Sequence, residues 1–187
     1  MINTMARAIR VTVAAACAVS LAAVVGPGLS ARANPNSGVT GVAGGGHYLL
    51  QNVFDVQFAF IALQLSSGRA FGGFHQHLAT DSGTVDFTAV VTCLAVDPAL
   101  GRAWIGGVIV SNNSTDPAFD TPIHQPGHDI WFRVLDNGHG HDPADRTTFV
   151  GFEGVIPSSE SYCQQRIWPA DNARTWPVTE GNISIHP

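Results

Sequence analysis

The stretch from Val85 to Val110 constrains the fold more than any other part of the chain. It consists of two runs rich in β-branched and aromatic residues, joined by the linker Asp97–Gly101, which contains proline and glycine. Two such runs with a short linker of this kind predict a β-hairpin. Strand alternation would place the odd-numbered residues of the first run, including Cys93 and Ala95, on one face. We interpret the stretch as the central hairpin of an all-β domain.

Shorter runs with the same alternation predict the remaining strands. They are His47–Gln51, Val53–Leu63, Arg69–Ala79, Asp129–Leu135, Thr147–Glu153 and Ile183–Ile185. Together with the hairpin they give about eight strands in a single antiparallel domain. We favour an up-and-down barrel over a sandwich, because closure removes exposed sheet edges. Of the two long connections, residues 111–128 and 154–182, the second is expected to hold a short helix at Ser158–Gln165 with Ser158 as its N-cap.

Residues 1–33 are predicted to be a secretory signal peptide. Arg7 and Arg10 give it a basic start, and Ala31–Ala33 has the small residues of a cleavage site. The apolar run Val11–Val25 between them is too short to cross a bilayer. The expected location is secreted or extracytoplasmic, with no membrane attachment after cleavage of the signal.

The chain that would remain divides into two parts. Residues 34–46 form a Gly-rich lead-in that we expect to be flexible, and residues 47–187 form the barrel-like domain. Residues 34–187 together carry six arginines and no lysine against fourteen acidic residues. An acidic chain without lysine argues against nucleic acid and anionic membranes as partners. The lack of lysine also excludes mechanisms that need a lysine Schiff base.

Two cysteines, Cys93 and Cys163, lie outside the predicted signal peptide. In an exported protein such a pair is expected to form a disulfide. The alternative is a catalytic thiol, which suits neither an oxidising compartment nor the apolar strand face predicted for Cys93. We therefore predict a Cys93–Cys163 disulfide.

Eight histidines in a chain with few charges are its most suggestive polar feature. His75 and His77 are expected on one face of a strand, at a spacing that zinc sites use. His124 and His128 lie in a long connection at the same predicted rim, next to Asp129. These five residues could converge as a zinc site, with Asp129 as a ligand or an orienting group. The alternative is that the two strand histidines are ordinary surface residues and that the protein has no cofactor.

Trp104 and Trp131 are the candidate ligand-binding residues, because indole rings can stack on a sugar or an apolar ligand. Core packing is the alternative use of these rings. No G-x-S-x-G, P-loop, H-E-x-x-H or G-x-G-x-x-G motif occurs in the sequence. These absences lower the expectation of an enzyme, and no catalytic residue is assigned.

Four phrases of the sequence are similar to those of exported bacterial proteins for which no activity is known. The phrases are Gly45–His47, Val91–Val96, Ala103–Val108 and Asp129–Gly138. The resemblance covers the chain from about Gly44 to Gly151 and implies export and a β-rich domain. It implies no cofactor, partner or site residue.

These features favour an exported, non-enzymatic β domain that binds a small ligand or a surface partner. The first alternative is a metal-dependent enzyme at the histidine site, in which metal-bound water would be the nucleophile. The second is a protein-interaction module that acts through the long connections 111–128 and 154–182. The pattern predicts no oligomeric state.

Overall fold

The computed structural model describes residues 38–138 and 142–186, so the predicted signal peptide lies outside the described part. Within that part the strands are β1 (Val39–Leu50), β2 (Phe54–Leu65), β3 (Ala70–Thr80), β4 (Gly83–Asp97), β5 (Arg102–Asn112), β6 (Asp129–Leu135), β7 (Arg146–Thr147), β8 (Gly151–Phe152) and β9 (Trp176–His186). The helices are α1 (Ser159–Gln165) and three short 3-10 helices, η1 (Pro117–Phe119), η2 (Pro122–His124) and η3 (Ala170–Asn172). No helix of the described residues is long and apolar enough to span a membrane.

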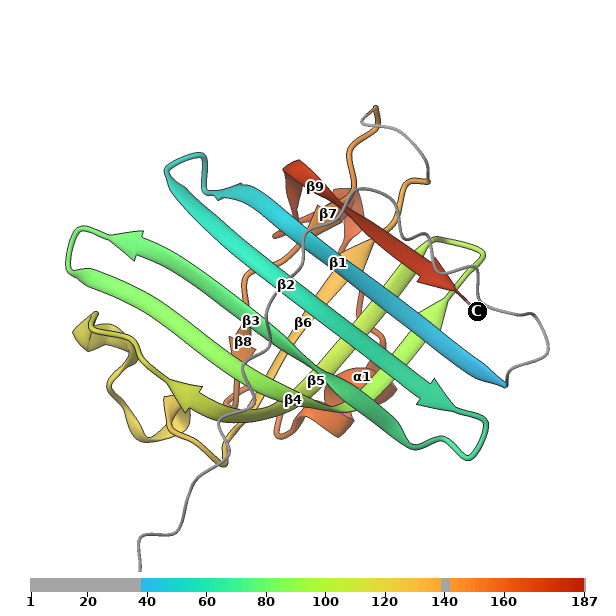
Figure 1. Ribbon diagram of the computed structural model, residues 1–187, viewed down its shortest axis with the longest axis horizontal. Coiled ribbons are helices and arrows are strands. Elements are labelled where there is room, and N and C mark those ends of the chain that lie inside the picture. Colours follow the sequence, from blue (N-terminus) through green and yellow to red (C-terminus); the bar gives the residue numbers. More distant parts are fainter. Residues whose placement is uncertain (1–37, 139–141, 187) are drawn as a thin grey trace, which may run out of the picture. The chain divides into compact units, whose positions relative to one another are not determined.

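All nine strands belong to one antiparallel sheet (Figure 1). The strand order is β5-β4-β3-β2-β1-β9-β7-β6-β8, and an additional pairing between β5 and β6 closes eight of the strands into a ring. Strands β1 to β6 follow one another around this ring as in a meander. The prediction of a single antiparallel all-β domain is therefore confirmed.

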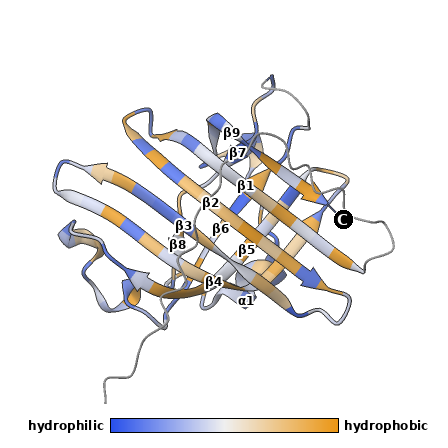
Figure 2. Cartoon of the chain, in the orientation of Figure 1, coloured by the Kyte–Doolittle hydropathy of each residue, from blue (hydrophilic) through white to orange (hydrophobic). Residues whose placement is uncertain are grey.

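One face of each long strand fills the interior of the ring. Along β2, Val56, Phe58 and Phe60 are buried whereas the residues between them are exposed. Figure 2 shows hydrophobic and hydrophilic bands along the same strand. Phe132 of β6 meets Phe60 and Phe74 edge-on, with ring centroids 5.1 and 4.9 Å apart. Aromatic side chains therefore occupy the interior of the ring.

The long connection between β5 and β6 folds back onto this core. The ring of Phe119 lies 5.7 Å from that of Phe87, and the imidazole of His124 lies 4.3 Å from the ring of Phe152. The side-chain amide of Asn112 donates hydrogen bonds to the carbonyl oxygens of Phe119 and His124, both at 3.0 Å. These contacts make the connection an ordered cover over the aromatic core.

The Gly-rich lead-in differs from its prediction. Residues 39–46 are not a flexible segment but belong to β1, which pairs with β2 on one side and β9 on the other. Gly46 has a φ of +145°, and a Cβ there would lie 1.8 Å from the carbonyl oxygen of Glu180. Glycine is required at this position because the backbones of β1 and β9 approach so closely.

The seventh predicted strand, Thr147–Glu153, is split into β7 and β8. Between β7 and β8 the backbone forms hydrogen bonds with the buried side chain of Gln76 rather than with a neighbouring strand. Gln76 donates to the carbonyl of Thr148 at 3.3 Å and accepts from the N–H of Val150 at 3.2 Å. The last strand, β9, is longer than the predicted Ile183–Ile185. Its first residues continue the ring by pairing with β7.

A bulge in β4 changes the predicted face of Cys93 and Ala95. The register with β5 shifts between Val91 and Cys93. As a result Leu94 points into the interior core, whereas Cys93 and Ala95 join a second apolar cluster. The second cluster also contains Trp131 and residues of α1, so it lies between the ring and this helix.

Candidate ligand-binding hollow

The five predicted zinc ligands do not form one group in the structure. His75 and His77 share Asp86 of β4: Nε2 of His75 lies 3.2 Å from one carboxylate oxygen, and Nδ1 of His77 lies 3.3 Å from the other. Neither His124 nor His128 takes part in this group. Among the described residues, no three histidine, cysteine, aspartate or glutamate side chains are arranged to hold a metal ion. The structure therefore does not bring the five residues together.

His124 is packed among aromatic rings of the cover over the core. Its Nδ1 lies 2.9 Å from the hydroxyl of Thr121, and its ring contacts Phe119 and Phe152. Burial lowers the pKa of His124 below that of an ordinary histidine. The neutral imidazole acts here as part of the apolar packing.

His128 and Asp129 hold neighbouring segments in place. Glu153 accepts from the backbone N–H of Asp129 at 2.8 Å, and its second carboxylate oxygen lies 3.2 Å from Nδ1 of His128. The carboxylate of Asp129 accepts from the backbone N–H of Ser159 at 3.0 Å and also from the Ser159 hydroxyl. Asp129 thus fixes the first residue of α1.

Trp104 is a packing residue of the wall. Its side chain is only 3% exposed, and its Nε1 donates to the carbonyl of Ile167 at 2.9 Å. Its ring meets Trp168 edge-on at 5.8 Å. Trp104 attaches residues 153–175, the connection between β8 and β9 that we call the last connection, to β5. Its ring is therefore not available to a ligand, contrary to the prediction from the sequence.

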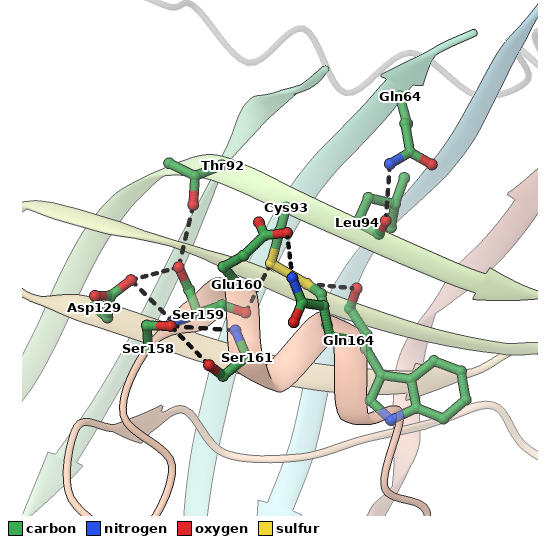
Figure 3. Close-up of a disulfide and its surroundings, with 12 residues drawn as sticks. Gln64, Thr92, Cys93, Leu94, Asp129, Ser158, Ser159, Glu160, Ser161 and Gln164 are labelled. Atoms are coloured by element: carbon green, nitrogen blue, oxygen red, sulfur yellow. Dashed lines mark hydrogen bonds between the residues drawn. A yellow bond between two sulfur atoms is a disulfide. The ribbon is translucent and has the colours of Figure 1, made fainter. Parts of the chain in front are cut away.

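The structure confirms the predicted disulfide, which attaches helix α1 to the outside of β4 (Figure 3). The Cα atoms of Cys93 and Cys163 are 6.2 Å apart. The predicted N-cap is also confirmed, since the Ser158 hydroxyl accepts from the N–H of Ser161 at 3.2 Å. A disulfide in this position is compatible with an extracytoplasmic location. The disulfide also holds Tyr162, the neighbour of Cys163, against Trp131 of β6.

A hollow of about 320 Å³ opens where β6, α1 and the last connection meet, and we call it the Trp131 hollow. It is lined by Trp131, Arg133, residues 148–151, Ile156, Tyr162, Arg174 and Trp176. Trp131 stacks on Tyr162 with centroids 5.5 Å apart and an angle of 20° between the rings. The volume is at the lower end of the range found for small-molecule sites. Of the two tryptophans predicted to bind a ligand, only Trp131 lines the hollow.

Two arginines give the Trp131 hollow its charge. Arg133 comes from β6, where its guanidinium lies over the ring of Trp168 at 5.4 Å and donates to the carbonyl of Ala173 at 3.0 Å. Arg174 belongs to the last connection. Within residues 38–138 and 142–186, every ion pair involves a histidine, so no described arginine lies within 4.0 Å of a carboxylate oxygen.

The backbone that presents Arg174 is held firmly. Arg174 has a left-handed φ of 60°, which costs a residue other than glycine of the order of 1 kcal/mol. The neighbouring Thr175 is fixed by Arg146, which donates to its hydroxyl at 2.8 Å and to its carbonyl at 2.7 Å. These bonds offset the conformational cost and keep the Arg174 backbone in place.

The ionisable groups of the hollow are hydrogen-bond donors at neutral pH. Burial raises the pKa of Tyr162 to about 12, although the nearby Arg133 acts in the opposite direction. The phenol therefore keeps its proton, and the two guanidinium groups keep their charge. None of the described lining residues carries a carboxylate or an imidazole. The hollow can donate hydrogen bonds but lacks the usual groups for proton transfer.

The residues predicted from the sequence to bind a ligand do not include Arg133, Tyr162, Arg174 or Trp176. These four come from β6, α1, the last connection and β9, and no motif joins them. One signal was present: with no lysine in the chain, every cationic side chain outside the predicted signal peptide, apart from histidine, is an arginine. Several of these arginines lie near tryptophans in the last third of the sequence, which is the part of the chain that lines the Trp131 hollow.

Comparison with known proteins gave no further assignment, since no family model, curated protein or solved structure matches this chain.

Proposed function

We propose that the protein is an exported binding protein that holds a small organic ligand in the Trp131 hollow. The observation that carries this proposal is the composition of the hollow, in which Trp131, Tyr162 and Trp176 meet two arginines without carboxylate partners in the described chain. Apolar and aromatic walls with a few convergent polar groups are typical of ligand sites. The absence of carboxylate and imidazole groups from the lining favours binding over catalysis.

The proposal also agrees with how the hollow is built. The Cys93–Cys163 disulfide fixes the wall that carries Tyr162, and Arg146 fixes the segment that carries Arg174. A site whose walls are ordered before binding loses less conformational entropy when a ligand enters. The disulfide supports the extracytoplasmic location that the proposal assumes.

The four tryptophans allow a direct test. Trp131 and Trp176 line the hollow, whereas the indole N–H groups of Trp104 and Trp168 donate to Ile167 and Asn172 within the protein. We would titrate the protein with benzoate, phenylacetate, their amides and benzyl alcohol, and follow the four indole N–H resonances by NMR. We expect binding to shift the resonances of Trp131 and Trp176 and to leave that of Trp104 almost unchanged, whereas Trp168, which lies under Arg133, is not used as a reference.

A variant that fills the hollow provides the control. Ile156→Phe places a larger side chain in the lining, whereas Val155 is fully exposed and outside it, so Val155→Phe is the matched change. Only Ile156→Phe should abolish the shifts. If none of the five compounds moves the Trp131 and Trp176 resonances of the wild type at millimolar concentration, the proposed function is wrong.

A further inference from the structure

We propose that the ligand of the Trp131 hollow is a small aromatic or cyclic carboxylate, an inference that rests on the proposed function and names its ligand class. The charge of the hollow favours an anion. The chain has a net charge of −5, yet the hollow combines two arginines with no acidic lining residue among those described. Such a site repels cations and attracts anions.

Arg133 has an unsatisfied donor. Its Nε atom is buried and has no hydrogen-bond partner in the described part of the chain, as is also true of Arg102, which lies outside the hollow. The rest of the Arg133 guanidinium is partly exposed and donates to the carbonyl of Ala173. A buried N–H needs a hydrogen-bond acceptor, and a cationic group favours an acceptor of opposite charge. A carboxylate provides both, because its two oxygens match the planar fork of an arginine.

Arg174 lies in the lining on a backbone that is held in place. The backbone there is left-handed, and the bonds from Arg146 to Thr175 fix this segment. Arg166 has the same conformation but does not line the hollow, so the position of Arg174 in the lining, rather than its backbone alone, indicates a role. We infer that Arg174 provides the second guanidinium for the same anion.

The apolar half of the hollow and its volume define the rest of the ligand. Ile156 and Trp176 provide flat or aliphatic surface next to the two arginines. About 320 Å³ accommodates a small aromatic or cyclic molecule with an acidic substituent. The ligand class is therefore the small aromatic or cyclic carboxylates.

The test compares compounds of equal shape and different charge. Benzoate and phenylacetate should bind at least about tenfold more tightly than benzamide and phenylacetamide, measured as dissociation constants by NMR titration. Phenyl phosphate is included, because it offers the same arginines a different anion. Tighter binding of phenyl phosphate than of both carboxylates would overturn the carboxylate assignment.

The matched variants are Arg174→Gly and Arg166→Gly. Both arginines are exposed, both lie in the last connection, and both have a left-handed backbone, with φ of 60° and 48°. Glycine suits both positions, so both variants should fold. Arg174→Gly should weaken benzoate binding about tenfold and leave benzamide binding unchanged, whereas Arg166→Gly should change neither.

Two outcomes overturn the inference in different ways. If the amides shift the Trp131 and Trp176 resonances with the same dissociation constants as the acids, the hollow is a ligand site but not an anion site. In that case the proposed function stands and the carboxylate inference fails. If the acids, the amides and benzyl alcohol all fail to bind, both fail. Equal losses of benzoate binding in the two glycine variants would also contradict the role of Arg174.

Discussion

A Cβ atom added to Gly151 would lie 2.5 Å from Nε1 of Trp131. The backbone of β8 therefore rests directly on the indole, which also stacks on Tyr162 of α1. The ring is held between a strand backbone and a helix side chain, and it is only 6% exposed. This contact fixes the floor of the Trp131 hollow.

Gly151→Ala should lower the free energy of unfolding by about 1–3 kcal/mol, because the new methyl group overlaps an indole that cannot move away from Tyr162. Urea unfolding measures the change. Gly73→Ala is the milder change used for comparison, since the nearest atom to its Cβ would be the Ala89 carbonyl oxygen at 3.3 Å, a contact that a shift of a few tenths of an ångström relieves. A Gly151→Ala protein as stable as the Gly73→Ala protein would show that Trp131 is not confined.

Gln76→Leu should destabilise the protein by about 2 kcal/mol or more. The Gln76 side chain is 2% exposed and is the acceptor for the N–H of Val150, so leucine leaves a buried donor without a partner. Gln57→Leu, on the exposed face of β2, should change stability by less than about 0.5 kcal/mol. Urea unfolding of the two variants compares them directly. Similar losses in both would contradict an anchoring role for Gln76.

The features that the sequence predicted correctly are local ones. The alternation in Val85–Val110 and Asp129–Leu135 identified strands, and the serine at 158 identified the start of α1. The cysteine pair was the one long-range contact that the sequence could identify, because only two cysteines remain outside the predicted signal peptide. Each of these depends on residue type and spacing alone.

The features that the sequence could not predict depend on tertiary contacts. The bulge after Val91 reverses the faces of Cys93 and Ala95, and nothing in the alternation marks it. Gly46 was read as flexible, because the close approach of β9 that requires glycine there involves residues more than 130 positions away. The Trp131 hollow likewise depends on contacts between segments that are distant in the sequence, namely β6, α1 and the last connection. Its arginines could therefore not be predicted as ligand-binding residues.

Loss of the disulfide should have a large effect on stability. Replacing both Cys93 and Cys163 by alanine releases a span of 70 residues and should cost about 4 kcal/mol by the chain-entropy model. Unfolding in urea, followed by circular dichroism, measures the loss. The wild type in a reducing buffer should unfold at the same urea concentration as the variant. Two titratable thiols in the native, unreduced protein would show that the disulfide does not form.

The contact between Glu153 and the residues 128–129 predicts a dependence of stability on acid. The backbone N–H of Asp129, together with His128, lowers the pKa of Glu153 below that of an ordinary glutamate. Its ionised form therefore adds stability at neutral pH that is lost as the pH falls through its folded-state pKa. Glu153→Gln should be about 0.5–1 kcal/mol less stable at pH 7 and equal to the wild type in strong acid. Urea unfolding across this pH range checks it, with the exposed Glu160, which bonds Gln164 of its own helix, changed to Gln as the control. A stability difference that stays constant from pH 7 into strong acid would show that Glu153 acts through packing rather than charge.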